Sequence, residues 1–174
     1  MATKTAKKTT TKKTIAKKKS ARVKKKLIDY LVTFLKSSDL KFQTDDDPNI
    51  LTMQFGGDKT AYKCVFDVQD EKGIILFYIF GPVQVPTEKI LDACKFIALA
   101  NFGLQVGNLE LDVRDGEVRY KSVLILEGAT PQKSTFKRFI YPAIISMDKY
   151  YPKLLKFIYS DISPEQAVTE ADEK

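Results

Sequence analysis

Basic side chains are concentrated at the start of this 174-residue sequence. Residues 1–26 contain eleven lysines and one arginine with no acidic residue, whereas the rest of the chain contains 17 basic and 22 acidic side chains. Such a segment attracts phosphate backbones, or another anionic surface, through counterion release. Because lysine dominates and aromatic side chains are absent from it, we expect contacts that do not read base sequence. The candidate nucleic-acid-binding residues are Lys7, Lys8, Lys12, Lys13, Lys17, Lys18, Lys19, Arg22, Lys24, Lys25 and Lys26.

The alternative interpretation of this segment is a solubilising extension that binds nothing specific. Its lysine, threonine and alanine cannot bury enough apolar surface to offset an ordering entropy of about 1–2 kcal/mol per residue. We therefore expect residues 1–22 to be a disordered basic tail, residues 23–168 to form the folded domain, and residues 169–174 to fray. Apart from Ile15 the tail has no hydrophobic anchor, and no run in the sequence reaches the roughly 18 apolar residues of a membrane span.

The rest of the sequence offers few groups for catalysis or metal binding. It has no histidine, which removes Ser-His-Asp triads, Cys-His dyads and most zinc sites. Cys64 and Cys94 are too few for a cysteine-rich zinc site and are expected to be buried thiols. Gly56-Gly57 lacks the frame of a phosphate-binding loop, and residues 45–49 lack the glycine and the glutamate of a calcium loop. We expect no catalytic, cofactor or metal site, and we do not expect an enzyme.

Hydrophobic periodicity predicts the elements that carry these residues. A first helix begins near Val23 and ends around residues 37–38. Strands at 50–55, 60–68 and 74–80 follow, with connections short enough for antiparallel hairpins. The third of these strands is apolar on both faces, which favours a central position covered on both sides.

Proline and glycine mark the limits of the later helices. A second helix opens at residues 86–88 and ends at Gly103. A third begins at Pro131, with a kink expected at Pro142 and a break or restart at Pro152, because proline removes a backbone N–H and clashes with the preceding turn. A short helix follows residues 163–166.

Between the second and third helices, residues 107–128 are predicted to form a β-hairpin. Asp115-Gly116 favours a two-residue type I′ turn, which fixes the register. The run 123–126 is apolar on both faces, so we expect cover or a partner there on both sides. The expected cross-strand pairs are Arg114–Glu117, Asp112–Arg119 and Glu110–Lys121 on the charged face, and Val113–Val118, Leu111–Tyr120 and Leu109–Ser122 on the apolar face.

The order helix, three strands, helix, two strands, long helix predicts an α+β protein with a single antiparallel five-stranded sheet. The segment GNLELDVRDGEVRYKSVLILEG and the later MDKYYPKLLKFIYSDISPEQAV resemble the YbjN-like domain family, over Leu27–Val168. The resemblance implies the fold of the type III secretion chaperones, a tendency to dimerise, and a chaperone-like or regulatory role. It supplies no catalytic motif.

Two functions remain open from the sequence. In the first, an acidic, dimeric, chaperone-like domain holds a protein partner while the tail binds DNA or RNA without sequence preference. In the second, the chain is an accessory subunit of a nucleoprotein or ribosomal assembly, attached mainly through the tail. We expect a cytoplasmic protein, with nuclear or nucleoid association through the tail. The candidate homodimer interface consists of Phe96, Ile97, Val123 and Ile125.

The tail predicts a steep salt dependence of DNA binding. If about eight to ten of its basic side chains contact phosphates, log affinity for a duplex falls with log salt at a slope of roughly −7 to −9, whatever the duplex sequence. Fluorescence anisotropy across a salt series measures this slope. The chain lacking residues 1–26, whose net charge is −5, is the control and is expected not to bind. DNA binding by that truncated chain, or a slope near zero for the full chain, contradicts the prediction.

Overall fold

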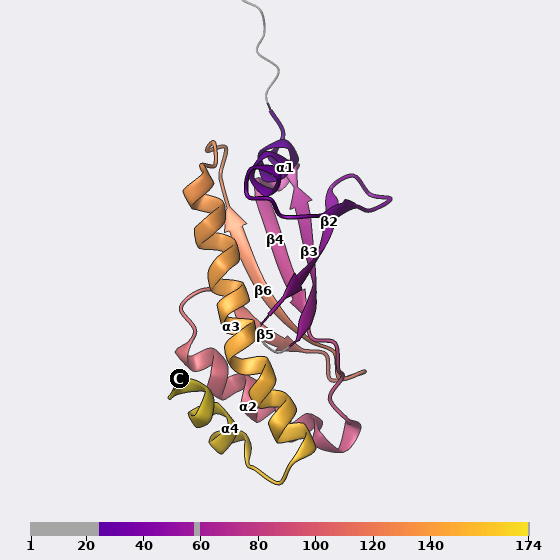
Figure 1. The fold of residues 1–174 in the computed structure, drawn as a ribbon, viewed down its shortest axis with the longest axis vertical. Helices are drawn as coiled ribbons and strands as arrows, with labels where there is room; N and C mark the ends of the chain where they lie inside the picture. Colours follow the sequence, from indigo (N-terminus) through magenta and orange to yellow (C-terminus); the bar gives the residue numbers. More distant parts are fainter. Residues whose placement is uncertain (1–24, 58–59, 174) are drawn as a thin grey trace, which may run out of the picture.

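The computed structural model describes residues 25–57 and 60–173 (Figure 1). Within them one antiparallel sheet of six strands, in the order β1-β2-β3-β4-β6-β5, packs against four helices. The strands are β1 (Gln43–Thr44), β2 (Ile50–Gly56), β3 (Ala61–Gln69), β4 (Ile74–Phe80), β5 (Asn108–Leu111) and β6 (Val118–Ile125). The helices are α1 (Leu27–Ser37), α2 (Ile90–Gly103), α3 (Lys133–Tyr159) and α4 (Pro164–Asp172).

The structure is therefore mixed α+β with a single antiparallel sheet, as predicted, but five was the wrong number of strands. The additional strand is β1, which pairs with Leu51 and Thr52 of β2. Two residues are too few to show the alternating pattern by which strands are recognised in a sequence.

Helices α1 and α3 pack on one face of the sheet, α2 lies beside β5, and α4 packs against α2 and α3. The rings of Phe66 and Phe77, on β3 and β4, stack with centroids 4.4 Å apart, and Phe139 of α3 lies 5.9 Å from Phe77. The central position predicted for β4 is confirmed. Its other face is only partly covered, mainly by neighbouring side chains: Tyr78 lies beneath the guanidinium of Arg119, at 4.7 Å.

Helix α3 runs without interruption from Lys133 to Tyr159, so the predicted break at Pro152 is wrong. The apolar face of the helix is buried both before and after this proline, since Met147 and Leu154 both lie in the core. Burial of this continuous apolar stripe offsets the loss of a single backbone hydrogen bond. Although α3 has 27 residues, charged side chains interrupt it, and no helix of the described chain qualifies as a membrane span.

The β5–β6 hairpin forms, but its register differs from the prediction by two residues. Leu111 pairs with Val118 and Glu110 with Arg119. A type I′ turn needs positive φ at both central residues, and here only Gly116 has it, with φ of 79°. The chain forms a longer turn instead, in which the Asp112 carboxylate accepts the Arg114 N–H at 3.0 Å. A two-residue shift keeps every side chain on its predicted face, because the strand period is two.

The new register changes the ion pairs. Glu110 contacts Arg119 at 2.8 Å and also Lys121, the one predicted partner that it keeps, while Asp112 pairs with Arg114 inside the turn. Burial alone would raise the pKa of Glu110, but hydrogen bonds from Lys121, Arg119 and Asn108 outweigh it and hold the pKa below its usual value. Side-chain and backbone hydrogen bonds from Arg114 hold the pKa of Asp112 well below its usual range.

Gly116 makes a contact that predicts a large effect of substitution. A Cβ at this position would lie 2.2 Å from the carbonyl oxygen of Val85, whose N–H donates to Gly116. Gly128 has nearly the same φ, 82°, with nothing within 4 Å of its Cβ position, so Gly128→Ala is a matched control. We expect Gly128→Ala to cost about 1–2 kcal/mol of backbone strain, and Gly116→Ala at least about 2 kcal/mol more. Urea unfolding measures both, and equal losses would contradict the contact.

The ion pairs of Glu110 predict a pH-dependent contribution to stability. Because its folded pKa is depressed, the contribution is present above the unfolded value of about 4.3 and disappears as the pH falls through the folded pKa. Glu110→Gln should lower the unfolding free energy by up to about 1 kcal/mol at pH 7, and the difference from the native protein should vanish in acid. Glu117→Gln, which removes a carboxylate without an ion pair among the described residues, is the control. A Glu110→Gln loss that is the same at every pH would refute this.

Candidate partner-binding groove

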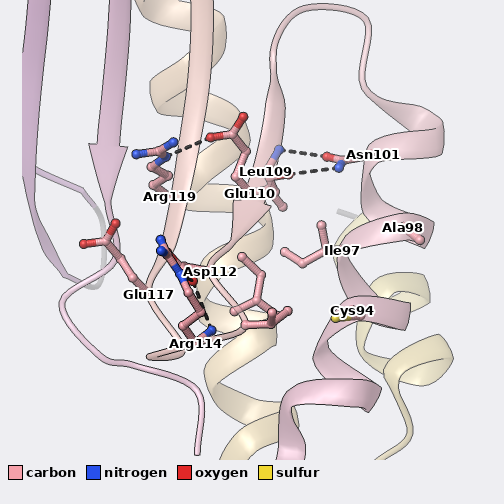
Figure 2. Close-up of a pocket in the computed structure, with 12 residues that line it drawn as sticks. Cys94, Ile97, Ala98, Asn101, Leu109, Glu110, Asp112, Arg114, Glu117 and Arg119 are labelled. Carbon is pink, nitrogen blue, oxygen red and sulfur yellow. Dashed lines mark hydrogen bonds and ion pairs between the residues drawn. The ribbon is translucent and has the colours of Figure 1, made fainter.

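A groove of about 810 Å³ lies between α2 and β5, with the β5–β6 turn at one end (Figure 2). Ile97 and Ala98 of α2 and Leu111 and Val113 of the hairpin supply its apolar lining. The groove exists because β5 is the last strand of the sheet, so that α2 lies beside its edge where another strand would pair.

Asn101 joins α2 to the edge of β5. Its side-chain nitrogen donates to the carbonyl oxygen of Leu109 at 3.0 Å, and its oxygen accepts the N–H of Leu109 at 2.8 Å (Figure 2). One amide side chain thus replaces the two hydrogen bonds that a neighbouring strand would provide. The N–H and C=O of Leu109 therefore point away from β6, toward the groove side of the strand.

Two residues further along, the edge of β5 is open. Backbone groups alternate in direction along an antiparallel strand, so the N–H and C=O of Leu111 point the same way as those of Leu109. No hydrogen bond to either group is found among the described residues. The groove therefore contains an unpaired backbone N–H and an unpaired backbone C=O next to apolar side chains.

Charged groups surround this apolar centre. Figure 2 shows Glu110 paired with Arg119 and Asp112 paired with Arg114, while Glu117 lines the groove without an ion pair among the described residues. The lining therefore presents carboxylates and guanidinium groups together. Such a surface suits a partner with apolar side chains flanked by charges of both signs.

The two cysteines differ in accessibility. Cys64 is fully buried on β3, and burial raises the pKa of its thiol to about 12. Cys94 is only partly buried and lines the groove. The expectation that both thiols are buried is therefore correct for Cys64 alone.

Next to the groove, α2 exposes a stripe of large apolar side chains. Phe102 is 96% exposed, Leu91 84% and Leu99 39%. At about 100° per residue these three positions fall within roughly 80° around the helix. Because α2 also buries apolar residues on its other side, it has more apolar surface than a helix packed on one side needs, although Lys95, paired with Glu165, lies within the stripe. An exposed stripe of this kind marks an interaction surface.

The four residues predicted for a dimer interface do not lie together. Phe96 is fully buried and stacks on Phe157 of α3, with ring centroids 6.5 Å apart, so it is not available to a partner. Ile97 lines the groove, whereas Val123 and Ile125 lie on β6 and are 44% and 63% exposed. Leu91 and Phe102 were not predicted as interface residues; the signal in the sequence was that α2 is apolar beyond its core-facing side.

Most of the predicted nucleic-acid-binding residues, Lys7 to Lys24, lie outside the described residues, as does the predicted helix start at Val23. Lys25 and Lys26 are exposed at the beginning of α1. The Lys25 ammonium donates to Thr33 Oγ1 at 3.1 Å and lies 4.5 Å from the centre of the Tyr30 ring. Within residues 25–57 and 60–173, no three histidine, cysteine or acidic side chains are grouped closely enough to hold a metal ion.

Comparison with known proteins places the chain in a family. No curated protein sequence matches it significantly. A solved structure titled "Crystal structure of YbjN, a putative transcription regulator from E. coli" is similar, with a TM-score of 0.56 over 73% of this chain and 92% of that one. At 14% identity this likeness shows the fold alone. Residues 28–156 match the model of the YbjN family, described as "Putative bacterial sensory transduction regulator". Since the match spans more than half of the sequence, the chain belongs to the YbjN family.

Proposed function

We propose that this chain is a non-enzymatic, chaperone-like regulatory domain that holds an apolar segment of a partner protein in the groove between α2 and β5. The observation that carries the proposal is the exposed stripe of α2, with Leu91 and Phe102 beside a groove of about 810 Å³. The description of the family as a regulator supports a binding role, and the sequence lacks the histidine on which most acid–base sites depend.

The composition of the groove defines the partner segment. Apolar side chains of the segment would cover Leu111, Val113 and the α2 stripe, where burying exposed apolar surface is favourable by about 25 cal/mol per Å². Its charged flanks would face the carboxylates and guanidinium groups of the rim. The family resemblance also implies a homodimer, which remains a proposal. In such a dimer, α2 of a second copy would occupy the groove.

A second function is favoured by the separation of charge along the chain. Twelve basic side chains in residues 1–26 precede a remainder of net charge −5, so sequence-independent attachment to nucleic acid belongs to the tail rather than to the domain. If the tail provides the main attachment, the chain is an accessory subunit of a nucleoprotein or ribosomal assembly. The salt dependence of duplex binding tests this candidate separately from the groove.

Cys94 allows the groove to be tested in the native protein. Because Cys64 is fully buried, a maleimide photo-crosslinker attaches selectively at Cys94, on the groove wall. After irradiation in nuclease-treated extract of the source cells, we expect one discrete adduct that disappears in Phe102→Asp. That substitution should leave thermal unfolding unchanged, since Phe102 is almost fully exposed. An adduct at twice the chain mass of 19.7 kDa identifies a second copy.

A matched probe on the opposite face is the control. In the double variant Cys94→Ser, Lys63→Cys, the crosslinker is attached to an exposed position of β3 outside the groove. The same adducts from both attachment points, or an adduct that persists in Phe102→Asp, would show that the groove does not select a partner.

A further inference from the structure

Strand β6 extends beyond its neighbour at the edge of the sheet. Seven of its eight residues, from Arg119 to Ile125, pair with β4, but β5 has four residues and its pairing stops at Asn108 with Lys121. Before Asn108 the strand pairing ends: Gly107 has a φ of 68°, and the carbonyl oxygen of Val106 accepts the Tyr120 hydroxyl instead of a backbone N–H of β6. Within the described residues, the section from Ser122 to Ile125 therefore has no strand on its outer side.

The direction of the backbone groups on this open section follows from the ladder with β4. At one end of this ladder the Leu126 N–H donates to the Gly73 carbonyl at 2.9 Å, and at the other the Val118 carbonyl accepts the Gly81 N–H at 2.8 Å. Even-numbered residues of β6 therefore direct their backbone groups toward β4, and odd-numbered residues direct theirs away from it. The N–H and C=O of Leu124 point toward β4. Those of Val123 and Ile125 point outward, and no hydrogen bond to them is found among the described residues. Two residues thus present a complete set of strand-pairing groups.

A cavity of about 300 Å³ lies beside this edge, on the helix side. Ser122 and Leu124 form one wall, and Thr135 and Arg138 of α3 form another. The Ser122 hydroxyl is fully buried and has no hydrogen-bond partner among the described residues. Side chains alternate along a strand, so every second side chain of a strand added at this edge would enter the cavity.

A basic side chain, Arg138, lines the same cavity. Arg138 is exposed and has no carboxylate within ion-pair distance among the described residues. Lys137, the preceding residue on α3, is also exposed and has no ion pair among the described residues. An acidic side chain is therefore the natural complement to this end of α3.

We propose that the Val123–Ile125 edge binds an extended, acidic segment of a partner protein by strand addition, with its apolar side chains over Val123 and Ile125 and a carboxylate on Arg138. This site is separate from the α2–β5 groove and does not depend on the function proposed for it. Main-chain hydrogen bonds would provide affinity, and the cavity and Arg138 would provide selectivity.

Charge favours this occupant over two alternatives, the basic tail of the chain and a second copy of the chain. The basic tail would bring like charges to Arg138, which disfavours it. A second copy paired antiparallel at this edge would be related by a two-fold axis perpendicular to the sheet. That axis leaves both α3 helices, and so both sets of Lys137 and Arg138, on the same face of the joined sheet. A foreign acidic segment has neither penalty.

Amide hydrogen exchange of the full chain, with a synthetic peptide of alternating valine and glutamate as the probe, tests the proposal. In the free protein the amides of Val123 and Ile125 should exchange rapidly, while that of Leu124 is already protected by β4. The peptide should slow exchange at Val123 and Ile125 at least tenfold and leave Leu124 unchanged. A purely electrostatic contact of the peptide, with the tail or with Arg138, would not give this alternation.

Three comparisons make the outcome decisive. The counterpart peptide with lysine in place of glutamate should give no protection, and Arg138→Glu should weaken binding of the glutamate peptide about tenfold or more. Val123→Pro removes an N–H that makes no bond within the described structure, so it should preserve folding and abolish protection at Ile125, whereas Val123→Thr should keep it. Phe102→Asp, which alters the exposed α2 stripe beside the groove, should have no effect.

Rapid exchange at Val123 and Ile125 in the presence of saturating peptide would overturn the proposal. Slow exchange without peptide would overturn it as well. If that protection depends on protein concentration, a second copy occupies the edge; if it disappears when residues 1–22 are deleted, the tail does.

Discussion

The packing of α3 against the sheet is the contact on which the positions of the other elements depend. Its buried stripe covers β4 and β6 and also receives the two helices beside it: Phe136 stacks on Phe34 of α1 at 5.1 Å, and Phe157 stacks on Phe96 of α2. One helix therefore fixes the positions of both α1 and α2 relative to the sheet. The other face of the sheet is left half-covered, and the sheet edge beside α3 becomes a surface of the protein.

Much of this architecture follows from the sequence because most of its elements are long and strongly periodic. Features that are very short, or that depend on contacts between distant parts of the chain, could not be predicted from the sequence. Strand β1 has too few residues to show a pattern, and the turn at Gly116 depends on Val85, some thirty residues away in the chain. The uninterrupted course of α3 through Pro152 depends on the amount of apolar surface that it buries, which is a property of the whole fold.

The candidate sites, too, were predictable only where the local sequence pattern determines which residues are exposed. Phe96 and Ile97 are adjacent, apolar and both buried, yet a rotation of about 100° leaves Phe96 wholly inside the core and brings Ile97 to the wall of the groove. An exposed Phe102 cannot be distinguished from a core residue by its type. Val123 and Ile125 were identifiable, because a run that is apolar on both faces needs more cover than one layer of helices provides.

The place where the basic tail joins the domain has a consequence for how the two parts could work together. Leu27, the first residue of α1, donates its N–H to Asp70, next to the start of β4, whereas the turn at the mouth of the groove lies against Val85, beyond the other end of β4. Seven residues of strand, about 3.3 Å each, separate these points by roughly 20 Å. An anion on the tail and a protein in the groove would therefore not compete for space. Each would raise the local concentration of the other, so that the domain acts as a short, rigid spacer between two molecules that need not recognise one another.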